Sequence, residues 1–571
     1  MQYKKLVEVY EELSSTTKRL EKTKILAKFL ENLEERDKDV LYLLLGDIYP
    51  EYDERKIGIS NQLAIKAISK ATGTNEKNIV KEWKKIGDIG MVAEILVKNK
   101  KQTTLQNHIL TTEKVLENLR KLPEFEGKGT VDKKISLITE LLTSSSPKEA
   151  LYLTRTLIGD LRIGIKESTI RAGMVEAFFE NKKEASEKIE QAVDKTNDLV
   201  SVFEIAKKRK ISDFEKLSVE VGKPIKAMLA QKVTTIEEGF KALGKPCAIE
   251  YKYDGFRLLI HKKQGKITLF TRTLENVTKQ FPDVIEYIKN HIKGHSFIID
   301  SEAVGYDKKT KEYTPFQNIS QRIRRKHNIE KLEKELPVEV NVFDIIYHNG
   351  KSLINEPFEK RSRLLRKIIQ NHPYKIIAAK QIITGDAKKA EDFYKKALQD
   401  NQEGIMMKSL NAEYKPGRRV GHMLKIKPEE RDLDLVITGA EYGKGKRSGW
   451  LSSFILSCQG EKDEFLEIGK MGTGIKEKSN EEVGGVSFHE LTEKIKPIIK
   501  EEHGKSVTIK PKIVVSVTYQ EIQKSPTYNS GFALRFPRFT ALRPDKKPED
   551  ASTIKEVEKD FENQKRNWRY G

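Results

Sequence analysis

The sequence predicts a multidomain protein: an all-α section (residues 1–220), an α+β section (221–427), and a small β-barrel with a C-terminal helix (428–571). Three observations predict this order. The chain has 571 residues, too many for one ordinary hydrophobic core. Apolar residues recur at helical spacing in the first section. Short β-branched runs dominate the second section, and short strands separated by glycines dominate the third.

The first section reads as helical because its apolar residues fall on one side of each turn. Leu6, Tyr10 and Leu13 follow this spacing, as do Leu26 and Leu30. Few glycines or prolines interrupt the pattern, and Lys and Glu fill most other positions. We interpret the apolar stripe as core packing.

The other two sections show strand-like runs with helical stretches between them. A helix-compatible, polar tail follows Glu549. A small barrel is the natural fold for the short strands of the third section. In chain order, the runs that predict strands are Cys247–Tyr251, Lys266–Phe270, Phe297–Asp300, Glu339–Phe343, Leu435–Ala440, Phe454–Cys458 and Ile513–Tyr519, and those that predict helices are 283–292 and 360–370.

The charge balance favours a polyanionic partner. The chain carries 106 Lys and Arg against 85 Asp and Glu, a formal net charge of +21. A generally lysine-rich proteome is the alternative explanation. Two cysteines, Cys247 and Cys458, support neither a disulfide framework nor a zinc ribbon. No apolar run reaches the ~18–20 residues of a membrane span, so we expect an intracellular protein of cytoplasm or nucleoid that binds no membrane.

Lys252 is the candidate covalent nucleophile. In the stretch Glu250–Arg257, strand alternation would place Glu250, Lys252 and Asp254 on one face. Gly255 then permits a tight turn or a close backbone approach. The pattern K-x-D-G occurs by chance in a Lys-rich chain. Whether it indicates a nucleophile therefore depends on the segments that follow.

Carboxylates and one aromatic residue recur in later strands. Asp300 and Glu302 would project from one strand face, where paired acids can hold Mg²⁺ or a ribose hydroxyl; a solvated acidic pair is the alternative. Phe343 could stack on a base or belong to the core. Glu403 supplies a further carboxylate beside a turn glycine, Gly404.

Basic clusters follow near the end of the second section and of the third. Lys425 and Lys427 would share a strand face shortly after Arg419, and such a cluster calls for an anion such as phosphate. Arg543-Pro-Asp545-Lys546 closes a second basic segment. For each cluster alone, a solvated basic face remains the alternative.

One segment of the helical section also suits phosphate contact. Arg155, Arg162 and Lys166 lie among Gly159 and Gly164, just before a Ser/Thr-rich helix start. An ordinary interhelical turn explains the same composition equally well.

Taken in order, these segments resemble the nucleotidyltransferase motif set of the ATP-dependent DNA ligases. The helical section resembles the DNA-binding domain of the three-domain replicative ligases of archaea and eukaryotes. The resemblance therefore implies a DNA-binding domain, an adenylation domain and an OB-fold domain. It also implies sealing of single-strand nicks in replication, repair and recombination, through lysyl-AMP and DNA-adenylate intermediates. The resemblance further implies ATP and Mg²⁺ (or Mn²⁺) as cofactors, nicked duplex DNA as the partner, and a monomeric protein.

The resemblance assigns roles by position. Lys252 would be the adenylated nucleophile, in one motif with Asp254 and Gly255. Glu302 and Glu403 would be associated with metal. The nucleotide contacts would be Glu250, Arg257, Arg272, Glu302, Phe343, Arg419, Lys425 and Lys427. The end motif of Arg543, Asp545 and Lys546 would orient pyrophosphate, and Arg155, Arg162 and Lys166 would grip the DNA minor groove.

Three alternatives compete with a DNA ligase. An RNA ligase or capping guanylyltransferase shares the covalent chemistry, but the large helical section and the R-x-D-K ending favour DNA. A non-catalytic DNA-end-binding scaffold is disfavoured because every mapped catalytic position is filled. An NAD⁺-dependent ligase would need zinc-finger cysteines that the chain lacks.

Two further expectations concern partners and motion. The segment Gln102–Ile109 has the glutamine and first apolar residue of a sliding-clamp-binding motif but lacks the paired aromatics, so a polar interhelical loop is the alternative. A swinging third section, hinged around Pro428–Leu435, would let the end motif and the DNA use the same space in turn.

Overall fold

A computed structural model gives the fold of the chain. It describes all residues except 101–108, 126, 128, 315, 317, 318, 320, 321, 324–328, 418, 429, 430, 444–446, 448, 463, 478–485 and 571. The chain divides into two compact units. The first comprises Met1–Gln231, Gly255–Lys380 and Lys408–Met423, and the second Lys232–Asp254, Gln381–Met407 and Leu424–Gly571.

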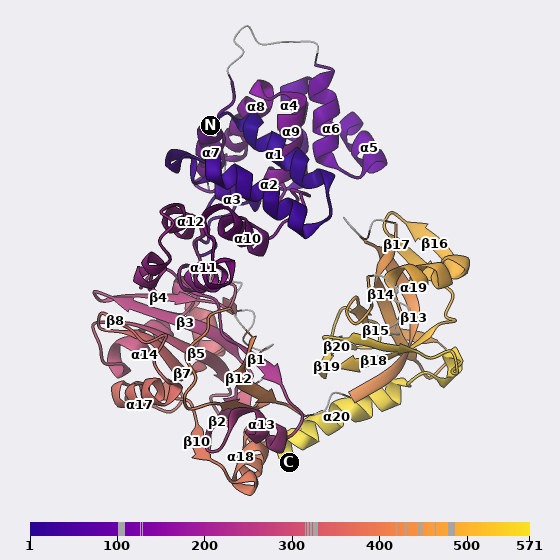
Figure 1. Cartoon of the computed structure of the whole chain (residues 1–571). Helices are drawn as coiled ribbons and strands as arrows, with labels where there is room; N and C mark the ends of the chain where they lie inside the picture. The colour runs from indigo at the N-terminus through magenta and orange to yellow at the C-terminus, as the bar shows by residue number, and fades with distance from the viewer. Residues whose placement is uncertain are drawn as a thin grey trace. The chain divides into compact units, whose positions relative to one another are not determined.

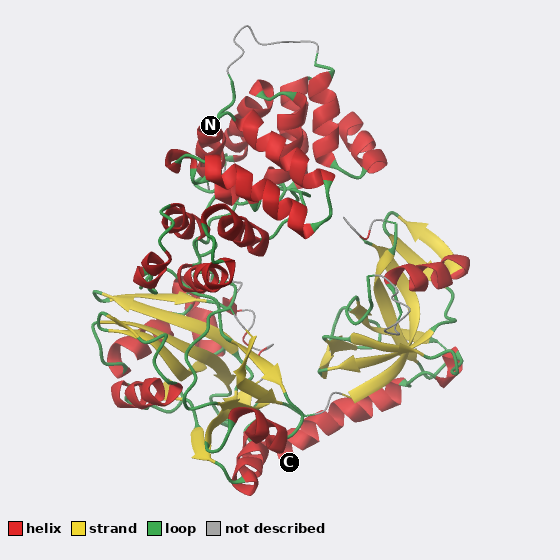
Figure 2. Ribbon diagram, viewed as in Figure 1, coloured by secondary structure: helices red, strands yellow, loops and turns green. Residues whose placement is uncertain are grey.

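The N-terminal section of the first unit is helical, as predicted, and Figure 2 shows it built from helices and loops. Tyr3, Leu6, Tyr10 and Leu13 of the first helix are fully buried in its core. The helices are α1 (Tyr3–Ser15), α2 (Arg19–Asn32), α3 (Val40–Leu44), α4 (Asn61–Thr72), α5 (Glu76–Ile86), α6 (Ile89–Lys98), α7 (Thr112–Lys121), α8 (Val131–Ser144), α9 (Pro147–Leu157), α10 (Glu167–Phe178), α11 (Lys182–Thr196) and α12 (Leu199–Lys207).

The remainder of the first unit is an α+β body around an antiparallel sheet (Figure 1). Its strands run in the order β4–β3–β5–β7–β8, with β6 on β5 and β9 parallel to β7. Apolar side chains of the sheet and of two helices form one core. The elements are β3 (Phe256–Lys263), β4 (Lys266–Phe270), α14 (Pro282–His291), β5 (Ser296–Tyr306), β6 (Tyr313–Thr314), α16 (Ile329–Glu335), β7 (Val338–His348), β8 (Lys351–Ser352), α17 (Phe358–Ile368) and β9 (Ile376–Ala378).

The second unit begins with a smaller sheet in which β2 lies between β10 and β11. The first five residues of β2 are all buried, so this strand is covered on both faces. Within β12 the chain passes from the first unit to the second. The elements around this sheet are β1 (Leu229–Lys232), α13 (Ile236–Leu243), β2 (Cys247–Lys252), β10 (Gln381–Thr384), α18 (Ala387–Gln399), β11 (Gly404–Lys408) and β12 (Arg419–Ile426).

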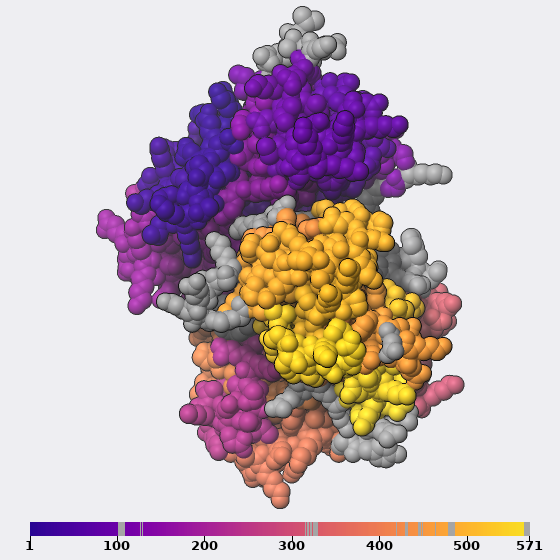
Figure 3. Space-filling view, turned by 90° about the vertical axis from the view of Figure 1, so that its right-hand side faces the viewer, coloured from indigo at the N-terminus to yellow at the C-terminus, as the bar shows by residue number. Residues whose placement is uncertain are grey.

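The C-terminal part of the second unit is rich in strands, and its surface is coloured orange to yellow in Figure 3. The long strand β13 pairs with β14, β17 and β18, and β18 also pairs with β21. The elements are β13 (Arg431–Tyr442), β14 (Leu451–Gln459), β15 (Phe465–Met471), α19 (Phe488–Ile495), β16 (Ile499–His503), β17 (Ser506–Ile509), β18 (Val514–Tyr519), β19 (Glu521–Lys524), β20 (Phe532–Arg535), β21 (Arg538–Leu542) and α20 (Ile554–Tyr570), the predicted tail helix.

Strand ends differ from the predicted pattern at three places. The strand β2 ends at Lys252, so Asp254 lies in the following turn and not on the strand face. The strand β12 ends at Ile426, one residue before Lys427. The strand β13 begins at Arg431, so the second half of the stretch from Pro428 to Leu435 is regular strand, and a hinge there stays a prediction.

The expectations about a clamp-binding segment and about a membrane span can be compared only with the described residues. Most of the candidate clamp-binding segment, residues 102–108, lies outside the described residues. No helix in the described part is both long and apolar enough to cross a membrane.

Candidate functional site

Lys252 and Lys427 share one carboxylate, that of Glu403. The Nζ atom of Lys252 lies 2.7 Å from Oε2 of Glu403, and the ammonium of Lys427 is ion-paired with the same oxygen. The backbone supports this arrangement, because the N–H of Glu403 donates to the carbonyl of Lys252 at 2.9 Å. Gly404 follows at φ +142°, and a Cβ there would lie 2.2 Å from the Ile426 carbonyl oxygen. Only glycine at position 404 lets the segments that carry Glu403 and Ile426 approach this closely.

The electrostatics of this cluster keep Glu403 ionised. Burial acts to raise the pKa of Glu403, but Lys252 and Lys427 outweigh it and the pKa is lowered. Burial lowers the pKa of Lys427, which Glu403 only partly offsets. The site therefore holds a mostly buried carboxylate between two amines, one of which is the predicted nucleophile.

Two glutamines that the sequence did not single out hold the neighbours of Lys252. Gln381 donates from Nε2 to Oε1 of Glu250 at 2.7 Å, directly opposite it in the β2–β10 pair. Gln402 accepts from the N–H of Asp254 at 3.0 Å and donates to the Asp400 carbonyl. In the sequence, the only sign of a role for Gln402 is its position next to Glu403. No sequence feature distinguishes Gln381 from other glutamines.

In the first unit, Arg257 is paired with Asp300 rather than standing alone. Its Nε lies 2.6 Å from Oδ1 and its Nη2 3.0 Å from Oδ2 of Asp300, and the Tyr414 hydroxyl donates to Oδ2 at 2.9 Å. Burial acts to lower the pKa of Arg257, but Asp300 outweighs it and the pKa is raised. Among the described residues, its Nη1 has no hydrogen-bond partner. That nitrogen is therefore a buried donor without a partner among the described residues.

This pairing corrects the expected acidic pair of Asp300 and Glu302. The Asp300 side chain is 3% exposed and serves as the counterion of Arg257. Glu302 is half-buried on β5, opposite Arg257 in the β3–β5 register. A Cβ on Gly255 would lie 2.3 Å from the Ala303 carbonyl oxygen and 3.1 Å from Cγ of Glu302, so this glycine is required for close packing.

Two further predicted nucleotide contacts lie in the first unit. Phe343 is half-exposed within the otherwise buried middle of β7. The Nζ atom of Lys408 lies 4.9 Å from the centroid of its ring. Arg272 is exposed just after β4. An accessible ring edge or face in a buried strand is what base stacking requires.

The remaining predicted phosphate contacts belong to β12. Arg419 opens this strand, and its side chain lies outside the described part. Lys425 is half-buried, and its carbonyl accepts from the N–H of Val233 at 3.1 Å. Leu424 and Ile426 are buried, as the predicted alternation requires.

The end motif is held by an acid that sequence reasoning missed. Oδ2 of Asp434, on β13, lies 2.8 Å from Nη1 of Arg543 and 2.8 Å from Nζ of Lys546. Asp545 pairs with Arg543 at 2.7 Å, and this hydrogen bond lowers the pKa of Asp545 to about 2. The three motif residues therefore form one cluster with Asp434, 109 positions before Arg543.

In the helical section, two of the three predicted DNA contacts share one acid. Oδ2 of Asp88 lies 2.7 Å from Nη2 of Arg155 and 3.1 Å from Nη1 of Arg162, while its Oδ1 caps α6. Arg155 is only 12% exposed and contributes mainly to this network. Arg162 is more exposed, and Lys166 is exposed at the start of α10.

Glu302 in the first unit and Glu403 in the second each offer a carboxylate of the kind that Mg²⁺ binds. Within the described chain, no group of three or more His, Cys, Asp or Glu side chains is placed to hold a metal. Mg²⁺ prefers oxygen ligands and commonly takes one or two carboxylates together with substrate phosphates. The ionised Glu403 already attracts two cations, so the donor set suits such an ion.

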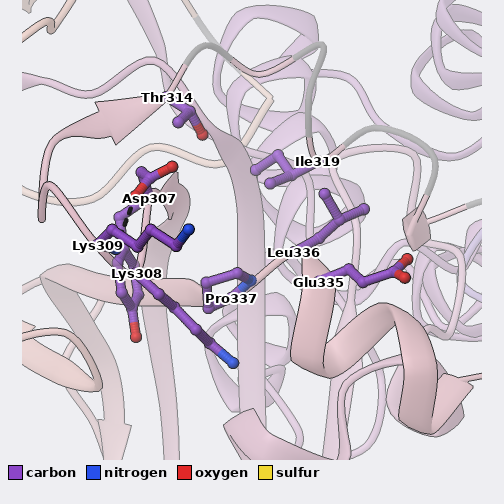
Figure 4. A pocket seen from close by; sticks show the side chains of 9 residues that line it. Asp307, Lys308, Lys309, Thr314, Ile319, Glu335, Leu336 and Pro337 are labelled. Atoms are coloured by element: carbon purple, nitrogen blue, oxygen red, sulfur yellow. Dashed lines mark hydrogen bonds between the residues drawn. The ribbon is translucent and has the colours of Figure 1, made fainter.

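A separate pocket contains none of the predicted site residues. It has a volume of about 370 Å³ beside the β5–β6 turn. Figure 4 shows Asp307, Lys308 and Lys309 on one side of it and Leu336 and Pro337 on another. Its mixed lining does not point to a particular ligand.

Comparison with known proteins covers nearly the whole chain. Residues 2–175 match the family description "DNA ligase N terminus", residues 227–427 "ATP dependent DNA ligase domain", and residues 447–546 "ATP dependent DNA ligase C terminal region". A protein named DNA ligase from Nanoarchaeum equitans is 43% identical over 99% of both chains. One from Thermococcus fumicolans is 39% identical over 98% of both. A solved structure titled "Pmar-Lig_PreS3" shares the fold with a TM-score of 0.57 and 18% identity, over 94% of this chain and 99% of that one.

Proposed function

The chain belongs to the family of ATP-dependent DNA ligases, and from this premise we propose that it seals nicks in duplex DNA through a lysyl-AMP and then a DNA-adenylate. The observation that carries the proposal is the cluster of Lys252, Glu403 and Lys427. It places a nucleophile, a carboxylate and a second cation within contact distance. Three successive transfers at phosphorus need such a set.

In the first transfer, the Lys252 amine attacks the α-phosphorus of ATP. A P–N bond forms, the P–O bond to pyrophosphate breaks, and the amine proton passes to solvent. Attack requires the neutral amine, and in the structure the Lys252 amine is paired with Glu403. Glu302 and Glu403 are each proposed to associate with metal, and a divalent ion at Glu403 would neutralise phosphate charge and compete for its carboxylate. Lys427 supplies a fixed cation for the phosphate beside Lys252.

The other residues bind and orient the nucleotide. Glu250, fixed by Gln381, and Phe343 suit the base, whereas Arg257, fixed by Asp300, and Glu302 suit the ribose. Arg272, Arg419 and Lys425 add positive charge for phosphates. The cluster of Arg543, Asp545 and Lys546 would orient pyrophosphate during the first transfer, with Asp434 as its resting counterion.

In the second transfer, the 5′-phosphate at the nick attacks the lysyl-AMP phosphorus. The P–N bond breaks and a pyrophosphate linkage forms, which regenerates Lys252. In the third, the 3′-hydroxyl attacks the 5′-phosphorus, a phosphodiester forms and AMP leaves. Arg162 and Lys166 of the helical section would hold the duplex in both steps. The formal net charge of +21 supports such binding.

We also infer the finer assignments of the fold. The strand-rich C-terminal section is proposed to be an OB-fold barrel, because β13 bridges β14, β17 and β18 and β18 leads to β21. The domains are proposed as 1–220, 221–427 and 428–571. We propose Mg²⁺ as the metal, with Mn²⁺ as a substitute, and a monomer that acts in replication, repair and recombination. A contact of Gln102–Ile109 with a sliding clamp stays a prediction.

The test is a pulse and chase. The protein is incubated with α-labelled ATP and Mg²⁺, freed of nucleotide, and chased with nicked duplex DNA or nicked duplex RNA. The proposal requires protein label that is stable in alkali but lost in acid, as a P–N bond is, and that disappears on the DNA chase as sealed strand appears. Label that moves only to RNA would establish an RNA ligase, and absence of label would favour the scaffold.

A further inference from the structure

The loop between α9 and α10 holds one residue with a side chain, Arg162, in a left-handed backbone conformation between two left-handed glycines. Gly159, Arg162 and Gly164 adopt left-handed φ values of +69°, +59° and +67°. For a residue with a side chain, such as Arg162, this conformation is uncommon and persists only where the surroundings enforce it. Leu161 and Ile163 are buried, whereas Arg162 and Lys166 are exposed. The loop therefore presents its cations because its apolar residues are anchored.

Lys22, on α2, is the group beneath this loop. Its side chain is buried, and its Nζ lies 2.6 Å from the carbonyl oxygen of Ile163 and 3.1 Å from that of Gly164. A buried ammonium is costly unless hydrogen bonds satisfy it, and these two carbonyls supply them. A Cβ on Gly164 would lie 2.6 Å from the same Nζ, so the loop backbone packs directly against the ammonium.

A second group holds the loop from its other end. Oδ2 of Asp88 forms ion pairs with two arginines. It lies 3.1 Å from Nη1 of Arg162 and 2.7 Å from Nη2 of Arg155. Lys22 thus acts on the backbone after Arg162, and Asp88 acts on the Arg162 side chain itself. The two charges come from α2 and from the start of α6, far from the loop in sequence.

We propose that Lys22 is a positioning residue for duplex DNA: its ammonium draws the carbonyls of Ile163 and Gly164 inward, so that Arg162 and Lys166 face the phosphates. The inference rests on the proposed function, because it assigns DNA to this loop. Lys22 also adds a fixed positive charge directly under the contact surface. Its role is distinct from nucleotide chemistry, which belongs to other sections of the chain.

The experiment compares the full-length protein with Lys22→Met, Lys22→Arg and Lys28→Met. Lys28 lies on the same helix and is exposed, so its replacement removes the same charge without touching the loop. For each protein, the rate of self-adenylation is measured first. The pre-adenylated proteins are then titrated with nicked duplex at one salt concentration, and kcat and KM for sealing are determined together with the thermal midpoint.

Lys22→Met is expected to weaken binding of nicked duplex and raise its KM by about tenfold, or about 1.4 kcal/mol. Self-adenylation should stay within about twofold of the unaltered protein, because a local loop change leaves the nucleotide site intact. Lys28→Met should change binding by no more than about twofold, as one screened surface charge. Lys22→Arg should recover part of the affinity because it keeps the charge and the donors.

Two outcomes would overturn the inference. One is DNA binding by Lys22→Met equal to that of Lys28→Met. The other is parallel loss of adenylation and binding, which would show general destabilisation. If Lys22→Met does not fold, Gly164→Ala tests the same contact, because the added Cβ would displace the loop from the Lys22 ammonium. Unchanged binding of nicked duplex by that variant would contradict the inference. Failure of the unaltered protein to adenylate or seal would instead overturn the proposed function.

Discussion

The Nζ atom of Lys252 lies 2.7 Å from Oε2 of Glu403, and Lys427 is paired with that same oxygen. A single, mostly buried carboxylate thus pairs with two amines. Its net lowered pKa shows that the two cations outweigh the cost of burying it. Under the proposed function, this carboxylate pairs with Lys252 before nucleotide binds and with a metal ion during adenylation, and the two roles compete for one oxygen.

Glu403→Gln is therefore expected to slow self-adenylation by about 10²-fold, the usual effect of removing one fixed charge from a reacting centre. The Mg²⁺ concentration for half-maximal rate should rise as well, because an amide is a weaker ligand. Rates of AMP uptake over a Mg²⁺ titration provide the measurement. Glu391→Gln, on the exposed face of α18, is the matched control. Equal rates for the two variants would refute the role of Glu403.

Asp434→Asn tests the counterion of the end motif. With its charge removed, Arg543 and Lys546 lose the acid that positions both of them. Self-adenylation should fall by about tenfold, since one charge-assisted hydrogen bond contributes about 1.5 kcal/mol. Sealing by protein that is already adenylated should be nearly unaffected.

The control for this experiment is Asp432→Asn, two residues earlier on the same strand and exposed. Single-turnover assays separate the adenylation step from the sealing steps. If Asp434→Asn slowed both steps equally, the cluster would be structural and not specific to the first transfer.

The buried pair of Arg257 and Asp300 makes a prediction about stability. Asp300→Asn leaves Arg257 without its counterion and should cost about 3–5 kcal/mol of unfolding free energy. Tyr414→Phe removes only the hydroxyl that donates to Asp300 and should cost about 1 kcal/mol. Denaturant unfolding of the full chain checks the order. Equal losses would mean that Arg257 has another counterion.

His261 predicts how stability depends on pH. Burial, helped by Arg257, lowers the pKa of His261 to about 3, and its Nδ1 accepts from the N–H of Gly222 at 2.8 Å. The folded chain keeps this imidazole neutral, whereas the unfolded chain takes up a proton below its ordinary pKa of 6.5. Stability from this group is therefore fully present above pH 6.5 and is lost as the pH falls toward 3.

The variant His261→Gln keeps an acceptor for Gly222 but cannot titrate. Between pH 6 and pH 4, the unaltered protein should lose about 1.4 kcal/mol of unfolding free energy per pH unit more than the variant. Unfolding of both proteins at pH 7, 6, 5 and 4 provides the comparison. Parallel pH profiles would show that the histidine is not buried in the neutral form.

The sequence predicted the sections and the motif residues better than it predicted their partners. Local patterns sufficed for Leu6, Tyr10 and Leu13, because burial along a helix follows from spacing. Asp434, Gln381 and Lys22 escaped notice because each acts on residues more than 100 positions away.

The acidic pair expected at Asp300 and Glu302 failed for the same reason. Alternation correctly put both on one strand, but the ion pair of Asp300 with Arg257 depends on how β3 and β5 align. Strand ends were similarly out of reach. Gly255 indicated a turn, but β2 already ends at Lys252, so Asp254 lies off its face.

The most direct test of the central claim is to locate AMP on the protein after incubation with ATP and Mg²⁺. Mass spectrometry of the intact chain and of its peptides should find one AMP, carried by the peptide with Lys252, and a nicked duplex should remove it. The Lys252→Ala protein should take up none. AMP on another residue, or uptake by Lys252→Ala, would contradict the account.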